Sequence, residues 1–534
     1  MRKEGFKVKI YDINKKIENK KHTMKHYAKR ILFSGVWITG LLILIEFFML
    51  LALFWRFTEY SGFIFEAMII GGVAVMIYII NEKSNPAYKI AWIIPIMLFP
   101  LVGSMLYLFV KLNFGNLAAK GILQRNIKET AKYAKTSEEI RIEIEAEESN
   151  FLKVTNYIEN AGGYPTWKNT SMKYYPLADY IQNPILEELE KAEEYIFLEY
   201  FMIEEGAFWN PILEELERKA AEGLDVRVIY DDFGSVALLP RKYHALLKEK
   251  GIQAKKYAKL SPFLSTHLNN RDHRKMIIID GKVAISGGFN LCDEYINAYE
   301  KYGHWKDNGF VIKGEAVYNY TLMFLQMWNS MDIERTQDYA KYLEKPRCSV
   351  FAPGYIIPYG DGPHQEENVA EQVYMDIISR ATKYVYIMTP YLILDHEMKQ
   401  CLMHASKSGV DVRIIMPHVP DKKSVFAIAR TYYPQLIKSG VKIYEYVPGF
   451  VHAKTFLADD EVAVVGTINL DFRSMYLHYE CGSLFYRTEG LSDIKSDFVE
   501  TFDKCQQITM KDYYRFPLHQ KLVGRTLRII GPLL

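Results

Sequence analysis

Two histidine–lysine–aspartate triplets with identical internal spacing recur along the chain. The first triplet is His273, Lys275 and Asp280, and the second is His452, Lys454 and Asp459. A neutral imidazole is a nucleophile or a proton acceptor near neutral pH, and an ammonium group stabilises negative charge that develops beside it. Two copies of this set therefore indicate a site for nucleophilic and proton-transfer chemistry on an anionic group.

Each triplet lies at a predicted β-hairpin. Residues i and i+2 of a strand point to one face, so each histidine projects together with its lysine. Apolar runs at 276–279 and 455–458 predict the first strands, and both aspartates then fall at tight turns. A single copy is adequately explained as a hairpin with surface histidine and lysine. The repeat extends beyond the hairpins. Asn290 and Asn469 follow their motifs at the same distance, and Thr467 occupies the position in the second copy that Gly288 occupies in the first.

The repeated motifs resemble those of the phospholipase D superfamily, whose members bring two such triplets into one active site. The flanking sequences YGHWKD, TPYLI and GTINLDFRS and the closing GPLL resemble the bacterial cardiolipin synthases more narrowly. The resemblance covers nearly the whole chain. It implies an α/β fold of two homologous lobes, each a mixed sheet flanked by helices, that share one active site and follow N-terminal transmembrane helices. An internal repeat agrees, since residues 223–230 match 409–416.

The resemblance implies that one histidine forms a phosphatidyl-histidine intermediate, while the other acts first as an acid and then as a base. We assign these roles to His273 and His452 respectively, with the reverse order left open. The groups expected to stabilise the phosphate are the ammonium groups of Lys275 and Lys454, the amides of Asn290 and Asn469, and the hydroxyl of Thr467. The chemistry requires no metal ion, nucleotide or other cofactor.

Carboxylates are needed to hold each imidazole in one tautomer. The family pattern suggests Glu480 for the second half, whereas Glu294 and Asp307 are both candidates for the first half. Asp280 and Asp459, although part of the motifs, are expected to brace their hairpins rather than to transfer protons.

Attack on the intermediate by the glycerol hydroxyl of a second phosphatidylglycerol yields cardiolipin and glycerol, which is the reaction that the resemblance implies. Attack by water yields phosphatidic acid, so a phospholipase D-type hydrolase or another phosphatidyltransferase is the alternative. A catalytically silent membrane scaffold is less favoured, because both motif sets are complete. The sequence indicates neither acyl-chain preference nor oligomeric state.

Composition limits the classes of function. The 534 residues exceed what one core accommodates and predict two or three domains. The formal net charge of +2 argues against a nucleic-acid-binding protein, which would need a strongly positive channel. Five cysteines without a CxxC pair predict neither a zinc site nor a disulfide framework.

Three apolar runs near the N-terminus predict membrane segments. They cover residues 31–55, 62–80 and 90–110, each close to the length that spans a bilayer core. Residues 1–30 hold eleven lysines and arginines, so this basic tail is predicted to stay in the cytoplasm. Pro95 and Pro100 interrupt the third run, which leaves two topologies open. Three crossings place the lobes outside, whereas two crossings and a re-entrant third run keep them inside. We favour a multi-pass cell-membrane protein with cytoplasmic lobes.

The rest of the chain divides by composition. We predict a charged linker helix at 112–165, lobe 1 at 166–345, lobe 2 at 346–510 and an amphipathic tail at 511–534. Basic residues at 241–259 precede an apolar loop at 260–270. This combination suits contact with an anionic lipid bilayer, and an ordinary solvated surface explains it equally well. The tail has two possible docking surfaces, the lobes and the bilayer.

Overall fold

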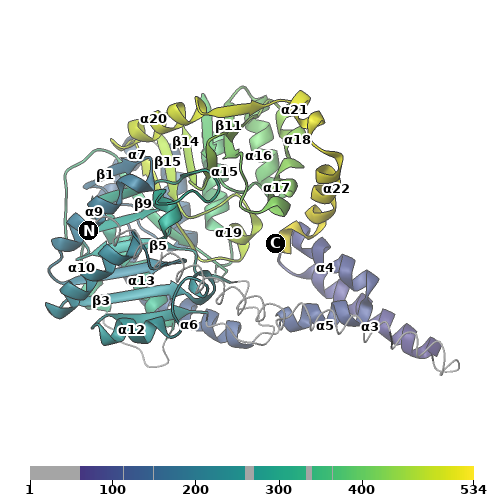
Figure 1. Ribbon diagram of the computed structural model, residues 1–534, viewed down its shortest axis with the longest axis horizontal. Coiled ribbons are helices and arrows are strands. Elements are labelled where there is room, and N and C mark those ends of the chain that lie inside the picture. The colour runs from purple at the N-terminus through teal and green to yellow at the C-terminus, as the bar shows by residue number, and fades with distance from the viewer. Residues whose placement is uncertain are drawn as a thin grey trace, which may run out of the picture. The chain divides into compact units, whose positions relative to one another are not determined.

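The computed structural model describes residues 61–111, 114–147, 149–258, 270–331, 339–363 and 365–533, together with Phe48 (Figure 1). The chain divides into two compact units. The N-terminal unit comprises residues 1–114 and 259–268, and the C-terminal body comprises 115–258 and 269–534. The predicted basic tail, the predicted segment 31–55 apart from Phe48, and most of the loop 260–270 lie outside the described residues.

The described helices of the N-terminal unit are α3 (Ser61–Asn81), α4 (Pro86–Leu98) and α5 (Pro100–Lys111). The predicted segment 62–80 falls within α3. The predicted segment 90–110 is divided between α4 and α5, because Pro100 disfavours helical geometry at Phe99, whose φ is −137° and ψ 79°. Among the described residues, no helix combines the length and the hydropathy needed to cross a membrane.

Helices α4 and α5 form an antiparallel hairpin. A Cβ on Gly103 would lie 2.7 Å from the Cα of Ile96, so only glycine permits this close approach. The Trp92 and Tyr107 rings meet edge to face with their centroids 5.4 Å apart. The chain therefore reverses direction at Phe99, and α5 ends beside the start of α4.

The region predicted as a charged linker is helical, and it packs closely on the rest of the C-terminal body. It contains α6 (Phe114–Thr130), α7 (Glu138–Glu147) and α8 (Ser149–Tyr157). The Asn126 amide donates to the carbonyl oxygen of Gln326 at 3.1 Å. The ring of Phe151 stacks on Tyr486, with centroids 3.7 Å apart. These contacts make the region an outer layer of the body.

Lobe 1 is built on a mixed sheet, as expected, with the strand order β1-β8-β6-β5-β2-β3-β4. Its strands are β1 (Thr170–Tyr175), β2 (Tyr195–Tyr200), β3 (Asp225–Asp231), β4 (Gln253–Tyr257), β5 (Lys275–Ile279), β6 (Val283–Gly287) and β8 (Gly309–Gly314). Strands β2, β3 and β4 are parallel, and the others pair antiparallel. Its helices are α9 (Gln182–Glu190), α10 (Trp209–Ala221), α11 (Asp232–Ser235), α12 (Tyr243–Glu249), α13 (Val317–Ser330) and α14 (Tyr339–Leu343). α10 buries Trp209, Ile212 and Leu216 on one face, which is the spacing of an amphipathic helix.

Lobe 2 repeats this topology with the strand order β9-β16-β15-β14-β10-β11-β12-β17, in which β17 is an additional edge strand. Its strands are β9 (Tyr355–Asp361), β10 (Tyr384–Met388), β11 (Asp411–Pro417), β12 (Lys442–Tyr446), β14 (Thr455–Ala458), β15 (Val462–Gly466), β16 (Glu480–Tyr486) and β17 (Cys505–Ile508). Its helices are α15 (Val369–Arg380), α16 (His396–Lys407), α17 (Lys423–Arg430), α18 (Tyr433–Lys438), α19 (Phe472–Tyr476) and α20 (Leu491–Phe502). The two predicted hairpins are thus β5–β6 and β14–β15.

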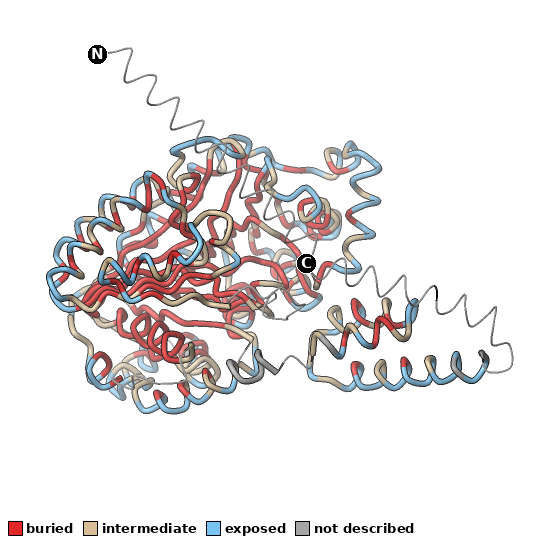
Figure 2. Tube along the Cα trace, turned by 60° about the horizontal axis from the view of Figure 1, so that its bottom comes forward, coloured by how far each residue is buried: buried red, intermediate tan, exposed pale blue. Residues whose placement is uncertain are grey.

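The two lobes share one core. Residues 317–329 of α13 are all buried, because the helix packs on β5, β6 and β8 of lobe 1 and on β9 of lobe 2. Strand β7 (His304–Lys306) of lobe 1 pairs in parallel with β13 (Gly449–Val451) of lobe 2. Buried backbone runs through the middle of the body, and the outer helices keep exposed turns (Figure 2).

The C-terminal tail docks on lobe 2, which is one of the two surfaces considered for it. It consists of α21 (Met510–Arg515), α22 (Leu518–Leu527) and a final turn at 528–533. A Cβ on Gly524 would lie 2.3 Å from the carbonyl oxygen of Ala427 in α17. The Arg430 guanidinium lies 3.9 Å from the centre of the Phe516 ring. The tail is therefore integral to the body.

Candidate active site

The two motif histidines lie where the lobes meet, just before β5 and β14. Lys275 is the first residue of β5, and Lys454 directly precedes β14. The backbone amide of His273 donates to the carbonyl oxygen of Tyr479 in lobe 2 at 2.9 Å. The amide of His452 donates to the carbonyl oxygen of Lys306 in lobe 1 at 2.7 Å. Each histidine is thus fixed by the backbone of the opposite lobe, and in both cases the next residue along that backbone is a carboxylate.

Those carboxylates bind the imidazoles across the lobe interface. Both carboxylate oxygens of Glu480 lie 2.9 Å from Nδ1 of His273, and Oδ2 of Asp307 lies 2.6 Å from Nδ1 of His452. A carboxylate at Nδ1 accepts a hydrogen bond from Nδ1–H of a neutral imidazole, which leaves the lone pair on Nε2. The structure thus places Glu480, expected to serve the second half, on the histidine of the first half.

Of the two candidates left open for the other carboxylate, the structure brings Asp307 to a histidine and not Glu294. Glu294 accepts hydrogen bonds from Tyr299 at 2.6 Å and from Lys301 at 2.8 Å, within its own loop. The exchange of carboxylates between lobes means that neither lobe holds a complete histidine–carboxylate pair by itself.

Gly288, which stands opposite Thr467 in the repeat, has a steric explanation. A Cβ at this position would lie 2.1 Å from Oδ1 of Asp307, so a side chain here would displace the carboxylate that orients His452. At the equivalent position in lobe 2, the Thr467 hydroxyl hydrogen-bonds to Oε2 of Glu480 and accepts from the amide of Cys481 at 3.0 Å. Thr467, expected to contact phosphate, instead holds the carboxylate of Glu480.

The motif lysines are fully buried beside the imidazoles. Lys275 Nζ donates to the carbonyl oxygen of His273 at 2.7 Å, and Lys454 Nζ donates to that of His452. Lys454 Nζ also lies 2.8 Å from Nδ1 and 3.1 Å from Nε2 of the His452 ring. Burial lowers the pKa of Lys275 to about 8 and that of Lys454 to about 7. An arriving phosphate would favour the charged form of both lysines.

The electrostatics of the imidazoles favour nucleophilic chemistry. Burial is the largest influence on both rings and holds the pKa of His273 and of His452 well below the ordinary value, against the opposing effect of their carboxylates. Burial alone would raise the pKa of Glu480, but its interactions with His273 and His478 hold it below the usual range. At neutral pH the site therefore presents neutral imidazoles oriented by an ionised carboxylate.

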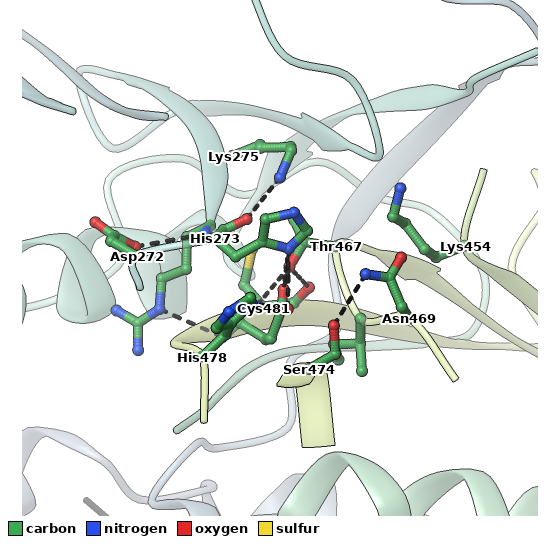
Figure 3. A network of polar contacts seen from close by, with 12 residues as sticks. Asp272, His273, Lys275, Lys454, Thr467, Asn469, Ser474, His478 and Cys481 are labelled. Carbon is green, nitrogen blue, oxygen red and sulfur yellow. Dashed lines mark hydrogen bonds and ion pairs between the residues drawn. The ribbon is translucent and has the colours of Figure 1, made fainter. Parts of the chain in front are cut away.

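The two asparagines expected to bind phosphate are buried and hold neighbouring groups. Asn290 Nδ2 donates to the Tyr295 hydroxyl at 2.6 Å, and its Oδ1 accepts from the amide of Met202 at 3.1 Å. Asn469 Nδ2 donates to Oγ of Ser474 at 3.0 Å. Each amide carries a second hydrogen, which is the group left for a phosphate oxygen. Figure 3 shows Asn469 and Lys454 together on one side of His273.

The motif aspartates brace turns, as the hairpin interpretation expects, although they belong to the catalytic motifs. The Asp280 carboxylate accepts from the amides of 193–195 at 2.8–2.9 Å. Asp459 does the same with the amides of 382–384 in lobe 2, at 2.6–2.9 Å. These bonds tie each hairpin to the start of the neighbouring strand, β2 or β10, and keep the carboxylates on the turns.

One residue near the site was not singled out from the sequence. His478 lies two residues before Glu480, and its ring centroid is 5.6 Å from that of His273 (Figure 3). Among the described residues, His273, His478 and Glu480 are the group whose ligand atoms lie close enough together to hold a metal ion. A histidine two positions before the carboxylate was the signal in the sequence that could have identified it.

Comparisons with known proteins identify the family and the fold. The family described as cardiolipin synthase, PLD-like domain, matches residues 185–328 and 374–505, and the family described as Phospholipase_D-nuclease N-terminal matches 72–111. A cardiolipin synthase of Geobacillus thermodenitrificans is 33% identical over 483 residues, covering 88% of this chain and 94% of that protein. An uncharacterized protein of Streptococcus mutans is 43% identical over 462 residues, covering 86% of this chain and 100% of that protein. The crystal structure of a Haemophilus influenzae phosphatidylserine synthase has the same fold, with a TM-score of 0.54 at 15% identity over 72% of this chain and 100% of that one.

Proposed function

Because the chain belongs to the cardiolipin synthase family of phospholipase D-like proteins, we propose that it is a phosphatidyltransferase that makes cardiolipin and glycerol from two molecules of phosphatidylglycerol. The observation that carries the proposal is the pair of buried imidazoles, each held at Nδ1 by a carboxylate of the opposite lobe and each beside a buried lysine. Such a site suits substitution at a phosphodiester without a metal ion or other cofactor.

The reaction has two steps. Nε2 of His273 attacks phosphorus of the first phosphatidylglycerol, the bond to the headgroup glycerol breaks, and His452 gives its proton to the departing oxygen. The anionic phosphate raises the pKa of the buried imidazole that must carry this proton, and Asp307 stabilises the resulting imidazolium. His452 then takes the proton from a glycerol hydroxyl of the second phosphatidylglycerol, whose oxygen attacks phosphorus and releases His273.

The first test uses purified full-length protein in mixed micelles, with phosphatidylglycerol as the only lipid substrate and without metal or nucleotide. Cardiolipin and glycerol are expected in equal amounts. Phosphatidic acid without cardiolipin would instead favour the hydrolase, and an unchanged lipid pool would favour another donor or the scaffold.

The two histidine roles are distinguished by variants. His273→Ala and His452→Ala are each expected to abolish transfer, whereas His404→Ala, on the exposed face of α16, is expected to keep wild-type activity. Lys275→Ala and Lys454→Ala should greatly reduce the rate. Quenching a short reaction of the wild type in alkali should trap label from the phosphatidyl group on His273. Label trapped on His452 would reverse the assignment.

We also propose that the N-terminal unit lies in the cell membrane. Large apolar side chains of α3, α4 and α5 are exposed, among them Phe63, Ile70, Met97, Leu98 and Met105. Exposing an apolar surface of this kind to water is unfavourable, whereas contact with apolar lipid tails is favourable. The polar contacts gather at the opposite end of the hairpin, where Glu82 pairs with Lys111 and accepts from the Tyr107 hydroxyl at 2.7 Å.

The hairpin supports one of the two topologies. α4 has 13 residues and α5 has 12, so at about 1.5 Å per residue each is near 20 Å long, shorter than the roughly 30 Å hydrocarbon core. Both ends of the hairpin lie beside the end of α3, since Lys89 Nζ donates to the carbonyl oxygen of Ile80 at 2.8 Å. A re-entrant hairpin of this kind returns the chain to the side it left. The crossings at 31–55 and 62–80 are predictions from the apolar sequence, since α3 does not by itself meet the length and hydropathy of a span. With these two crossings, the lobes face the cytoplasm.

Sidedness is tested by cysteine labelling in a variant without the native cysteines. A cysteine in place of Lys83 or of Lys111 is expected to react with an impermeant maleimide in inverted vesicles and not in intact cells. Labelling of position 111 from outside, with position 83 labelled from inside, would show that the third run crosses the bilayer.

A further inference from the structure

His478 is a buried imidazole that the proposed reaction does not use. The residue is 9% exposed, and among the described residues no group lies within hydrogen-bond distance of either ring nitrogen. Its Nδ1 is 3.8 Å from Oε1 of Glu480, an ion-pair separation that is too long for a hydrogen bond. A buried polar group without a partner costs folding free energy, so its position calls for a ligand.

The neighbours of His478 complete a set of metal ligands. One nitrogen of His478, one nitrogen of His273 and one carboxylate oxygen of Glu480 all lie within 4.8 Å of one another. Two imidazole nitrogens and one carboxylate oxygen are the donors that Zn²⁺ takes in three-ligand protein sites, with a water as the fourth ligand. Mg²⁺ and Ca²⁺ prefer sets made only of oxygen.

We propose that His273, His478 and Glu480 form a binding site for Zn²⁺ or a similar transition-metal ion, and that the bound ion inhibits the enzyme. The inhibitory consequence rests on the proposed role of His273 as the nucleophile, whereas metal binding itself does not.

A small movement brings the three ligand atoms, which already lie within 4.8 Å of one another, to one ion. Bonds of about 2.0–2.2 Å to zinc bring ligand atoms to roughly 3.3 Å from one another, so the ring of His478 must move inward by about an ångström. It is free to do so, because no hydrogen bond holds the ring.

The effect on catalysis follows from the position of one proton. In the metal-free site, Nδ1 of His273 bears the proton that Glu480 accepts, and Nε2 carries the lone pair. Coordination through Nδ1 moves that proton to Nε2, while coordination through Nε2 uses its lone pair directly. Either mode removes the nucleophile without any redox change or leaving group, and a chelator that extracts the ion restores it.

Binding and inhibition are measured separately on the full-length protein in micelles. Equilibrium dialysis with ZnCl₂ is expected to give one ion per chain in the wild type, and Co²⁺ is expected to give visible absorption bands of a tetrahedral site. His478→Asn, which keeps a polar group beside Glu480, should weaken binding at least about tenfold, as loss of one ligand does. His404→Asn on the exposed face of α16 is the matched control and should bind like the wild type.

The activity assay then follows cardiolipin formation at increasing ZnCl₂ or MgCl₂. Zinc should inhibit the wild type reversibly on addition of EDTA, magnesium should not, and His478→Asn should need at least about tenfold more zinc for half-inhibition. Equal zinc sensitivity of wild type and His478→Asn, or no stoichiometric binding in dialysis, overturns the proposal. If dialysis shows the ion but no lipid product forms with or without EDTA, the metal site stands and the proposed reaction fails.

Discussion

Replacing Lys454 by methionine is expected to inactivate the protein and at the same time to stabilise it. Lys454 is buried at the centre of the site, and burial lowers its pKa from 10.5 to about 7. One pKa unit corresponds to about 1.4 kcal/mol, so burial of this ammonium group costs about 4 kcal/mol of folding free energy at pH 7. Methionine has a similar length and carries no charge.

Part of that gain is offset. The variant loses the hydrogen bond to the His452 carbonyl, worth about 1 kcal/mol, and imperfect packing of the thioether costs about another 1 kcal/mol. A net stabilisation of about 2 kcal/mol remains, which in a body of this size raises the apparent melting temperature by about 2–4 °C. Transfer should fall at least about 100-fold, because the phosphate loses a cation in the transition state.

The pH dependence identifies the cause. The pKa of Lys454 is lower in the folded than in the unfolded protein, so between about pH 7 and 10.5 the unfolded chain binds one proton more. The folding free energy that the buried ammonium group costs therefore disappears as the pH rises through that window. Thermal unfolding is followed from pH 7 to 10 at one scan rate for the wild type, Lys454→Met and the control Lys282→Met. Lys282 lies on the surface. The Lys454→Met advantage should shrink with pH, and the surface variant should match the wild type. A Lys454→Met protein that is less stable than wild type at pH 7, or whose advantage is constant with pH, refutes the reasoning.

Glu480→Gln and Asp307→Asn are each expected to lower kcat about 100-fold or more with little change in KM, because each carboxylate stabilises its imidazolium in the transition state; a change confined to KM in steady-state assays would contradict this role. Gly288→Ala should lower kcat by a similar factor by displacing Asp307, and a crystal structure with that carboxylate unmoved would argue against the steric account. The melting temperature should fall as the pH drops below about 6.5, because the unfolded chain binds protons that the buried histidines resist, and this fall should be weaker in His452→Asn.

The local features of the lobes could be predicted from the sequence because they depend on short spacings. Strands β5 and β14 follow from apolar runs beside His273 and His452, and the aspartates at the hairpin turns follow from turn preference. Both aspartates lie at their turns with positive φ, 53° at Asp280 and 55° at Asp459. The division into two equivalent lobes follows from the paired motifs and from the match of residues 223–230 to 409–416.

The partners of the imidazoles depend on how the lobes face each other, which a one-dimensional pattern does not contain. Glu480 follows the second motif along the chain, yet it orients His273, because the backbone of Tyr479 pairs with the segment that carries His273. Gly288 stands opposite Thr467 in the repeat, and the structure shows that it makes room for Asp307. The approach of His478 to His273 likewise depends on how the lobes pack.

The sequence by itself determined the chemical groups of the site, since it supplies two imidazoles and two ammonium groups at one repeated spacing. Only the tertiary structure decided which carboxylate serves which histidine, that Thr467 binds a carboxylate, that the tail docks on lobe 2, and that α4 and α5 fold back at Phe99. The physical reason is the range of the interactions. Side-chain direction is set by neighbours along the chain, whereas hydrogen-bond partners, burial and the pKa values that follow from burial are set by segments that meet only when the lobes close on each other.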